Sequence, residues 1–136
     1  MSRKTAREVA MKLAFARLFG GEDTYEAILE KSGIEEKPTE DDMNYSDEVL
    51  CGIEEHSAEL DVKIADLAIG WSVERMPKVD LSILRVALYE MMYMDKIPSS
   101  VSINEAVELA KRFGGDRSSA YINGMLGTFA RQIDKE

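Results

Sequence analysis

The chain has 136 residues, of which 45% are hydrophobic and 32% are charged, and its formal net charge is −9. That length predicts a single domain over residues 1–136 with room for a sizeable core, and no apolar run reaches the roughly 18–20 residues that would cross a bilayer. The lone cysteine, Cys51, excludes an intramolecular disulfide, and because no secretory signal is evident we expect a cytoplasmic protein.

Hydrophobic residues recur with the period of helices along the chain, and no stretch alternates as a strand would. The pattern predicts an all-α fold of about seven helices in two small packed bundles that share a central helix. The expected helices cover residues 3–19, 24–31, 45–55, 80–94, 102–113 and 116–133. A further helix before residue 80 carries Ile64, Leu67, Ala68 and Trp71 at helical spacing. The acidic segment 34–44, which contains Pro38, is expected to be a solvated loop, and residues 57–61 a break.

The fifth helix is predicted to be the central one, because it is apolar around most of its circumference. Asp80 is expected to cap its start. In the sixth helix, Ser102 and Glu105 form a capping box, and Gly114 is expected to end the helix in a left-handed conformation. The buried face of the last helix is expected to comprise Ile122, Met125, Leu126, Phe129 and Ile133.

The chain offers little for catalysis. His56 is the only histidine, and no cysteine or second histidine stands at ligand spacing from it, so neither a zinc site nor a Ser-His-Asp triad is indicated. We interpret His56 as a surface residue of an acidic helix and Cys51 as a small core thiol. The sequence therefore predicts a protein that is not an enzyme and that uses no metal and no cofactor.

The first helix has two distinct sides. The side expected to face the core carries Ala6, Val9, Ala10 and Leu13. The opposite side carries Lys4, Arg7, Met11 and Phe15. Cations interleaved with an aromatic ring suit single-stranded RNA, since charges can meet phosphates and a flat ring can stack on a base. The alternative, which this helix alone favours, is that Met11 and Phe15 pack under the acidic loop and leave the cations solvated.

One flank of the last helix carries Arg117, Tyr121, Gly124 and Thr128. Arg117 and Tyr121 lie one turn apart and offer a cation and a stackable ring, and Lys111 lies on the flank of the preceding helix. The alternative is that Tyr121 anchors the bundle while Gly124 admits a neighbouring helix. Spacing alone does not choose between the two.

The charge is spread unevenly. Residues 1–20 hold five cations and one acid, residues 21–66 hold sixteen acids and three cations, and residues 67–136 hold nine of each. The overall field of an acidic protein repels nucleic acid. Any contact with RNA must therefore be local, and we expect a partner to assist it.

Four motifs stand out by their order and spacing. They are Trp71-Ser72-x-x-Arg75, Val79-Asp80-x-x-Ile83-Leu84-Arg85, Ile103-Asn104-Glu105-Ala106 and Tyr121-Ile122-Asn123-Gly124. Together they resemble the NusB family of transcription antitermination factors, densely from Trp71 onward and more loosely before it. Trp71, Asn104 and Asn123 are interpreted as structural, and Asn123 is expected to need a buried partner.

The resemblance implies an all-helical domain without catalysis that pairs with NusE, a protein of the small ribosomal subunit. The pair would bind the single-stranded boxA element of nascent RNA within the RNA polymerase antitermination complex, notably in ribosomal RNA operons. The family's arginine-rich start falls on Arg3, Lys4 and Arg7, and its base-stacking aromatic falls on Tyr121. With the cations of the last two helices, the predicted RNA-binding residues are Arg3, Lys4, Arg7, Lys111, Arg117 and Tyr121.

Two other interpretations belong to different classes. The first is a helical adaptor that binds only protein, with a fortuitous basic start. The second is the accessory domain of an RNA methyltransferase, which is disfavoured because the chain ends at Glu136 without room for a catalytic domain. A homodimer is also compatible with the sequence, since apolar flanks do not fix stoichiometry.

Overall fold

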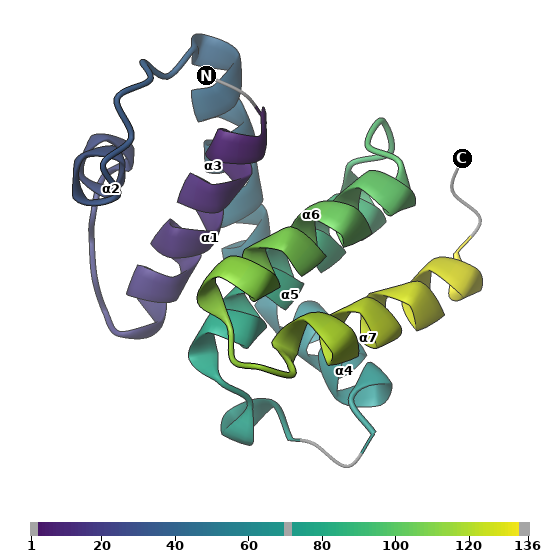
Figure 1. The fold of residues 1–136 in the computed structure, drawn as a ribbon. Helices are drawn as coiled ribbons and strands as arrows, with labels where there is room; N and C mark the ends of the chain where they lie inside the picture. Colours follow the sequence, from purple (N-terminus) through teal and green to yellow (C-terminus); the bar gives the residue numbers. More distant parts are fainter. Residues whose placement is uncertain (1–2, 70–71, 134–136) are drawn as a thin grey trace.

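The computed structural model describes residues 3–69 and 72–133 (Figure 1). Within these ranges the chain forms seven α-helices, one 3₁₀ turn and no strand, which confirms the all-α prediction. None of the described helices is long and apolar enough to span a membrane, and Trp71 lies outside the described residues. The elements are α1 (Arg3–Leu18), α2 (Tyr25–Lys31), α3 (Glu40–Glu55), α4 (Ser57–Leu67), the 3₁₀ turn η1 (Val73–Arg75), α5 (Lys78–Tyr93), α6 (Ser99–Phe113) and α7 (Ser118–Gln132).

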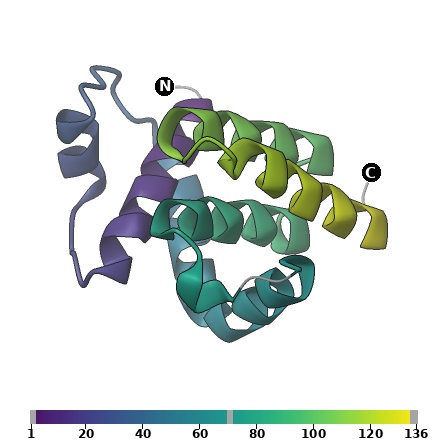
Figure 2. The ribbon, with the colours of Figure 1, turned by 60° about the horizontal axis from the view of Figure 1, so that its bottom comes forward.

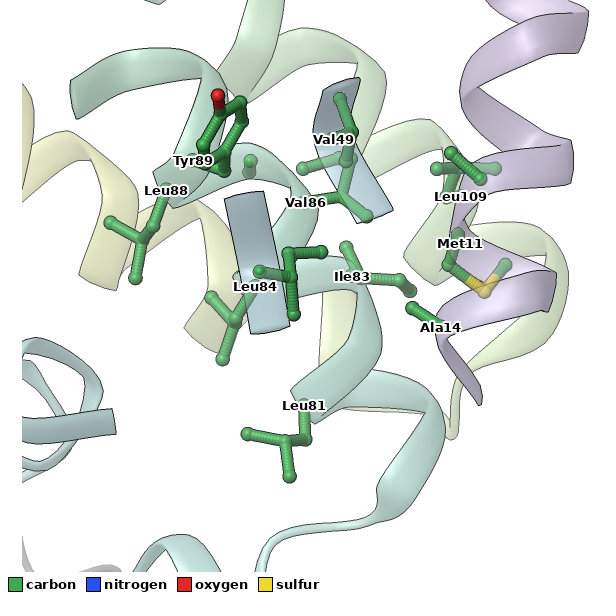
Figure 3. Packing of buried hydrophobic residues seen from close by; sticks show 14 of the residues in the cluster. Met11, Ala14, Val49, Leu81, Ile83, Leu84, Val86, Leu88, Tyr89 and Leu109 are labelled. Atoms are coloured by element: carbon green, nitrogen blue, oxygen red, sulfur yellow. The ribbon is translucent and has the colours of Figure 1, made fainter. Parts of the chain in front are cut away.

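α5 is the central helix, as its apolar circumference predicted. It contacts α1, α3, α4, α6 and α7, so both bundles pack on it. In Figure 2, α5 runs between the α6–α7 hairpin and α4. Leu84 and Leu88 of α5 have no exposed surface. Figure 3 shows α5 side chains close to buried side chains from α1, α3 and α6.

A buried charge cluster joins four helices at the C-terminal half of α5. Glu90 has no exposed surface, and its carboxylate accepts hydrogen bonds from Arg7 Nε of α1 at 2.6 Å and Ser102 Oγ of α6 at 2.8 Å. The Tyr45 hydroxyl of α3 donates to the same carboxylate. Burial alone would lower the pKa of Arg7, but the hydrogen bond to Glu90 and the nearby negative charges raise it. Arg7 therefore stays charged inside the fold.

The acidic segment expected to be a loop is partly helical. α3 begins at Glu40, and Thr39 caps it by accepting a hydrogen bond from the Asp42 amide at 3.1 Å. The acids at the start of α3 complement the positive end of its dipole, so their density marks a helix start. The predicted break at residues 57–61 is also wrong, because α4 begins at Ser57, directly after the single linking residue His56.

Two expected helix caps are wrong as well. α5 begins at Lys78, which places Asp80 inside its first turn with only 1% of its surface exposed. α6 begins at Ser99, so Ser102 lies within the helix and makes no capping bond there. In both cases a proline directly precedes the first helical residue, and its ring restricts the backbone φ angle at the start of the helix. The two polar side chains turn inward and bond to other helices.

Gly114 and Cys51 also differ from expectation. Gly114 has a φ of −90° and is not left-handed. It is crowded: a Cβ there would lie 2.7 Å from Ser118 Cβ and 2.8 Å from the Ala110 carbonyl oxygen, so the tight α6–α7 connection needs a residue without a side chain. Cys51 is exposed and not part of the core.

Candidate nucleic-acid interface

Arg3 and Lys4 occupy the first turn of α1. Arg3 Nη2 lies 2.8 Å from Asp41 Oδ2, and its guanidinium lies 4.5 Å from the centre of the Tyr45 ring. Lys4 is more available, since its side chain is 59% exposed and its Nζ is 3.8 Å from Glu105 Oε1. Exposed ion pairs at such distances are weak, about 0–1 kcal/mol. A phosphate can therefore replace the carboxylate partner of Lys4 at little cost.

The expectation that Arg7 lies on an exposed stripe is wrong. Arg7 is 4% exposed and Met11 is 2% exposed, because α1 packs against both α3 and α5. The guanidinium is committed to Glu90. Phe15 is half-buried, with its ring 5.1 Å from that of Phe19 in an edge-to-face contact. Arg7 is a packing residue, and we do not retain it as a phosphate contact.

Lys111 and Arg117 are both on the surface. Lys111 Nζ is 3.7 Å from Glu108 Oε1 on the same helix, and the lysine side chain is 59% exposed. Arg117 is exposed at the N-cap position of α7 and pairs with no acid among the described residues. A cation at a helix N-terminus opposes the helix dipole. The stability of α7 therefore gives no reason for an arginine at this position.

Tyr121 is half-buried and held in a fixed orientation by α5. Its hydroxyl donates to Asp80 Oδ2, which also accepts from Ser118 Oγ at 3.0 Å. Burial raises the pKa of Tyr121, and the hydrogen bond to Asp80 and the charge of Asp80 raise it further. The hydroxyl is thus engaged inside the protein, and the ring is the part that a ligand can reach.

A groove of about 350 Å³ opens beside this ring. It lies where α7 meets the end of α4 and the residue that follows η1. Its walls are mostly apolar, and the lining residues are Leu67, Ala68, Ile69, Met76, Tyr121, Gly124, Met125 and Thr128. Ile69 is 92% exposed at its rim. The flank that the helical spacing of α7 indicated is therefore one wall of a real depression.

The basic start of α1 and the Tyr121 ring do not meet at one point. Arg7 in the second turn of α1 is anchored to Glu90, whereas Tyr121 is anchored to Asp80. These two acids are ten residues apart on α5, which is about 15 Å along a helix axis. A ligand that touches both must be an extended strand that runs along the protein.

Two cations near Tyr121 escaped the sequence analysis. Arg75 ends η1 and Lys78 begins α5, one residue before and two residues after Met76 of the groove. Both are exposed, and neither pairs with an acid in the described part of the chain. In the sequence they stand far from Tyr121, and the tertiary fold brings their segment next to α7, through Met76 in the groove and the bond between Tyr121 and Asp80. No pattern of period 3.6 could have found them.

Asn104 and Asn123 are both exposed. The expectation of a buried partner for Asn123 is therefore wrong. Both residues line a shallow depression between α6 and α7 on the side of α7 away from Tyr121. Among the described residues, no three His, Cys, Asp or Glu side chains gather in a way that could hold a metal ion.

Comparison with known proteins identifies the family of this chain. The family model described as the NusB family matches residues 4–131. A transcription antitermination protein NusB from Agathobacter rectalis is 44% identical over 131 residues, covering 96% of this chain and 100% of the relative. The chain belongs to the NusB family. A transcription antitermination protein NusB from Clostridium botulinum (strain Kyoto) is 41% identical, and the match covers 93% of this chain and 98% of that relative.

Solved structures agree with this membership. NusB from T. maritima matches with a TM-score of 0.83 and 31% identity, over 97% of this chain and 92% of that one. A structure described as antitermination factors NusB and NusE in complex with dsRNA matches with a TM-score of 0.79. Its identity is 21%, over 96% of this chain and 97% of that one, so this likeness concerns the NusB fold alone.

Proposed function

We propose that this NusB-family protein is a transcription antitermination factor that binds boxA-type single-stranded RNA together with the ribosomal protein NusE. It acts by binding and without catalysis, in the cytoplasm, as part of the RNA polymerase antitermination complex on ribosomal RNA operons. The observation that carries the proposal is the Tyr121 ring, fixed by Asp80 at the edge of an apolar groove. Exposed Arg117 lies one helical turn away.

The charge distribution explains why a partner is needed. The chain carries a net charge of −9, and the cations proposed to meet phosphates (Arg3, Lys4, Lys111 and Arg117) are spread over the surface of several helices. An acidic body repels a polyanion at a distance, whereas a basic ribosomal protein adds attraction. The two proteins together are therefore expected to bind boxA more tightly than either alone.

Changing Tyr121 to Ala tests the stacking contact. Stacking on an aromatic side chain contributes about 1–3 kcal/mol per base, so Tyr121→Ala is expected to weaken boxA binding in the presence of NusE roughly 5- to 150-fold. Tyr121→Phe keeps the ring and loses only the hydroxyl bond to Asp80, and it should bind nearly as the parent does. Fluorescence anisotropy with labelled boxA RNA and a scrambled strand measures both. Equal affinity of the Ala variant and the parent would remove Tyr121 from the interface.

Salt dependence tests the phosphate contacts separately. Each cation that releases a counterion from single-stranded RNA contributes about 0.7 to the slope of log affinity against log salt concentration. Changing Lys4, Lys111 and Arg117 together to Gln should flatten that slope by about 2. Lys31→Gln is the control, since Lys31 on α2 is similarly exposed and paired with Asp23. The same slope in the triple variant and the parent would contradict the assignment.

The same titrations address the alternative of an adaptor that binds only protein. If NusE binds and no RNA binds with or without it, the adaptor function replaces the proposed one. Duplex RNA should be included as a competitor, because a fold neighbour was solved with double-stranded RNA. Sedimentation of the free protein measures self-association under the same conditions.

A further inference from the structure

Gly124 in the middle of α7 has no structural reason to be glycine. It is exposed, and a Cβ built there would find no heavy atom within 4 Å. Its φ is not positive, since the positive values among the described glycines belong to Gly20 and Gly33. A glycine inside a helix is less stable than alanine because it loses more backbone freedom on folding. Alanine at this position would therefore make α7 more stable than glycine does.

Other helical glycines show the contrast. At Gly52 of α3, a Cβ would lie 2.0 Å from Tyr89 Cε1, so packing requires the glycine. At Gly127, one turn after Gly124 on α7, a Cβ would meet only Arg131 Nη1 at 3.7 Å. That distance is an ordinary contact with the end of a flexible side chain. Gly127 is therefore a matched control for Gly124 in the same helix.

Gly124 lies in the wall of the groove beside Tyr121. Without a side chain there, the backbone of α7 is open to the groove, next to Met125 and Thr128. The Gly124 carbonyl already accepts a hydrogen bond from Thr128 Oγ1 at 3.0 Å. A glycine that neither packing nor conformation requires is expected where a ligand must approach the backbone closely.

The surroundings of the groove indicate the chemistry of the ligand. Arg75 and Lys78 lie within two residues of Met76, which lines the groove, and Arg117 lies one helical turn before Tyr121. All three are exposed, and none pairs with a described acid. An apolar groove with an aromatic wall and exposed cations on the adjoining segments suits a nucleotide, whose base is flat and apolar and whose phosphate is anionic. An apolar peptide would not need the three cations.

We propose that the groove beside Tyr121 holds one unpaired nucleobase against the backbone of α7 at Gly124, while Arg75, Lys78 and Arg117 neutralise the flanking phosphates. This inference rests on the proposed binding of single-stranded RNA and locates one base of that strand. It adds Gly124, Arg75 and Lys78 to the interface.

A substitution at Gly124 is expected to stabilise the fold and, at the same time, to weaken RNA binding, and the test measures both. Gly124→Ala should raise the melting temperature by a few degrees, as a helical alanine does where space is open, and should weaken boxA binding with NusE present roughly tenfold. Gly124→Leu should weaken it further. Gly127→Ala should raise the melting temperature similarly and leave the affinity unchanged. A boxA strand with 2-aminopurine at successive positions should show one position whose quenching by the protein is lost in Gly124→Leu.

The cations are tested by salt titration. Arg75→Gln with Lys78→Gln should flatten the slope of log affinity against log salt by about 1.4, at 0.7 per contact, and Lys31→Gln should not. If the parent binds no RNA, the proposed function fails and this inference with it. If the parent binds and Tyr121→Ala weakens binding but both Gly124 variants bind normally, only this inference is overturned. A lower melting temperature in Gly124→Ala would contradict its premise, and a loss of NusE binding without RNA would make the groove a protein site.

Discussion

Changing Arg7 to Met should lower the free energy of unfolding by about 3–5 kcal/mol, the range found when one partner of a buried ion pair is removed. Arg7 and Glu90 are 4% and 0% exposed, and Arg7 Nε lies 2.6 Å from Glu90 Oε2. The methionine would fill a similar volume, so the loss reports the charge left behind. The hydroxyls of Tyr45 and Ser102 would still donate to Glu90, and the guanidinium charge would be gone.

A matched control for this variant exists on the same helix. Arg17 Nη1 also lies 2.6 Å from a carboxylate oxygen, that of Glu54, but the two side chains are 42% and 65% exposed. Arg17→Met should cost less than about 1 kcal/mol, since solvent screens exposed pairs. Urea unfolding followed by circular dichroism measures both. Equal costs for the two variants would show that Arg7 is not buried in solution.

The double variant Arg7→Met with Glu90→Leu separates the buried charge from the lost packing. Replacing both members of a buried pair by apolar residues of similar size is often neutral, so the double variant should recover much of the stability. Tyr45 and Ser102 would lose their acceptor in it, which limits the recovery to part of the loss. If the double variant were less stable than Arg7→Met, the buried charge of Glu90 would not be the cause of the loss in Arg7→Met.

Helical periodicity sufficed for the core and for the central position of α5. Val9 and Ala10 of α1 and Leu126 of α7 have no exposed surface, as their spacing predicted. These predictions succeed because a helix exposes or buries whole faces, and a face repeats every 3.6 residues. The same rule failed for Arg7. It assumes that one side of a helix meets water, whereas α1 is covered by both α3 and α5.

Polar residues with distant partners were the main source of error. Ser102 and Asp80 carry the residue types of helix caps, but each bonds to a side chain on another helix. Arg7 and Glu90 are 83 residues apart in the chain, and no local pattern links them. The acids before residue 45 and Pro38 predict a loop, whereas α3 begins at Glu40, with Thr39 as its N-cap.

The candidate site divides in the same way. Tyr121, Gly124 and Thr128 could be grouped from the sequence, because they share one flank of a single helix, and the groove confirms that they lie together. Arg75 and Lys78 could not be added to them. Their closeness to Tyr121 depends on the turn that leads into α5 and on the bond between Tyr121 and Asp80. Helix faces are local, whereas a surface made by three segments depends on the tertiary fold.

Gly52→Ala should destabilise the fold by about 1–3 kcal/mol, the usual cost of adding a methyl group to a packed core. Helix propensity alone would favour alanine by roughly 1 kcal/mol. The expected loss arises because a Cβ would lie 2.0 Å from Tyr89 Cε1 and 2.4 Å from Cζ, and α5 holds that ring buried against α3. The same substitution at Gly127, where the nearest atom is 3.7 Å away, should stabilise.

The interaction between Gly52 and the ring can be isolated with a second substitution. Tyr89→Leu removes the ring atoms nearest to Gly52 as well as the hydroxyl that donates to Glu48 at 3.2 Å. In Tyr89→Leu, the further change Gly52→Ala should cost little or stabilise, so the double variant should lose less than the sum of the two single losses. Unfolding in urea of the four proteins gives this coupling. Strictly additive losses would mean that α3 and α5 are not held together by the fit of this ring over Gly52.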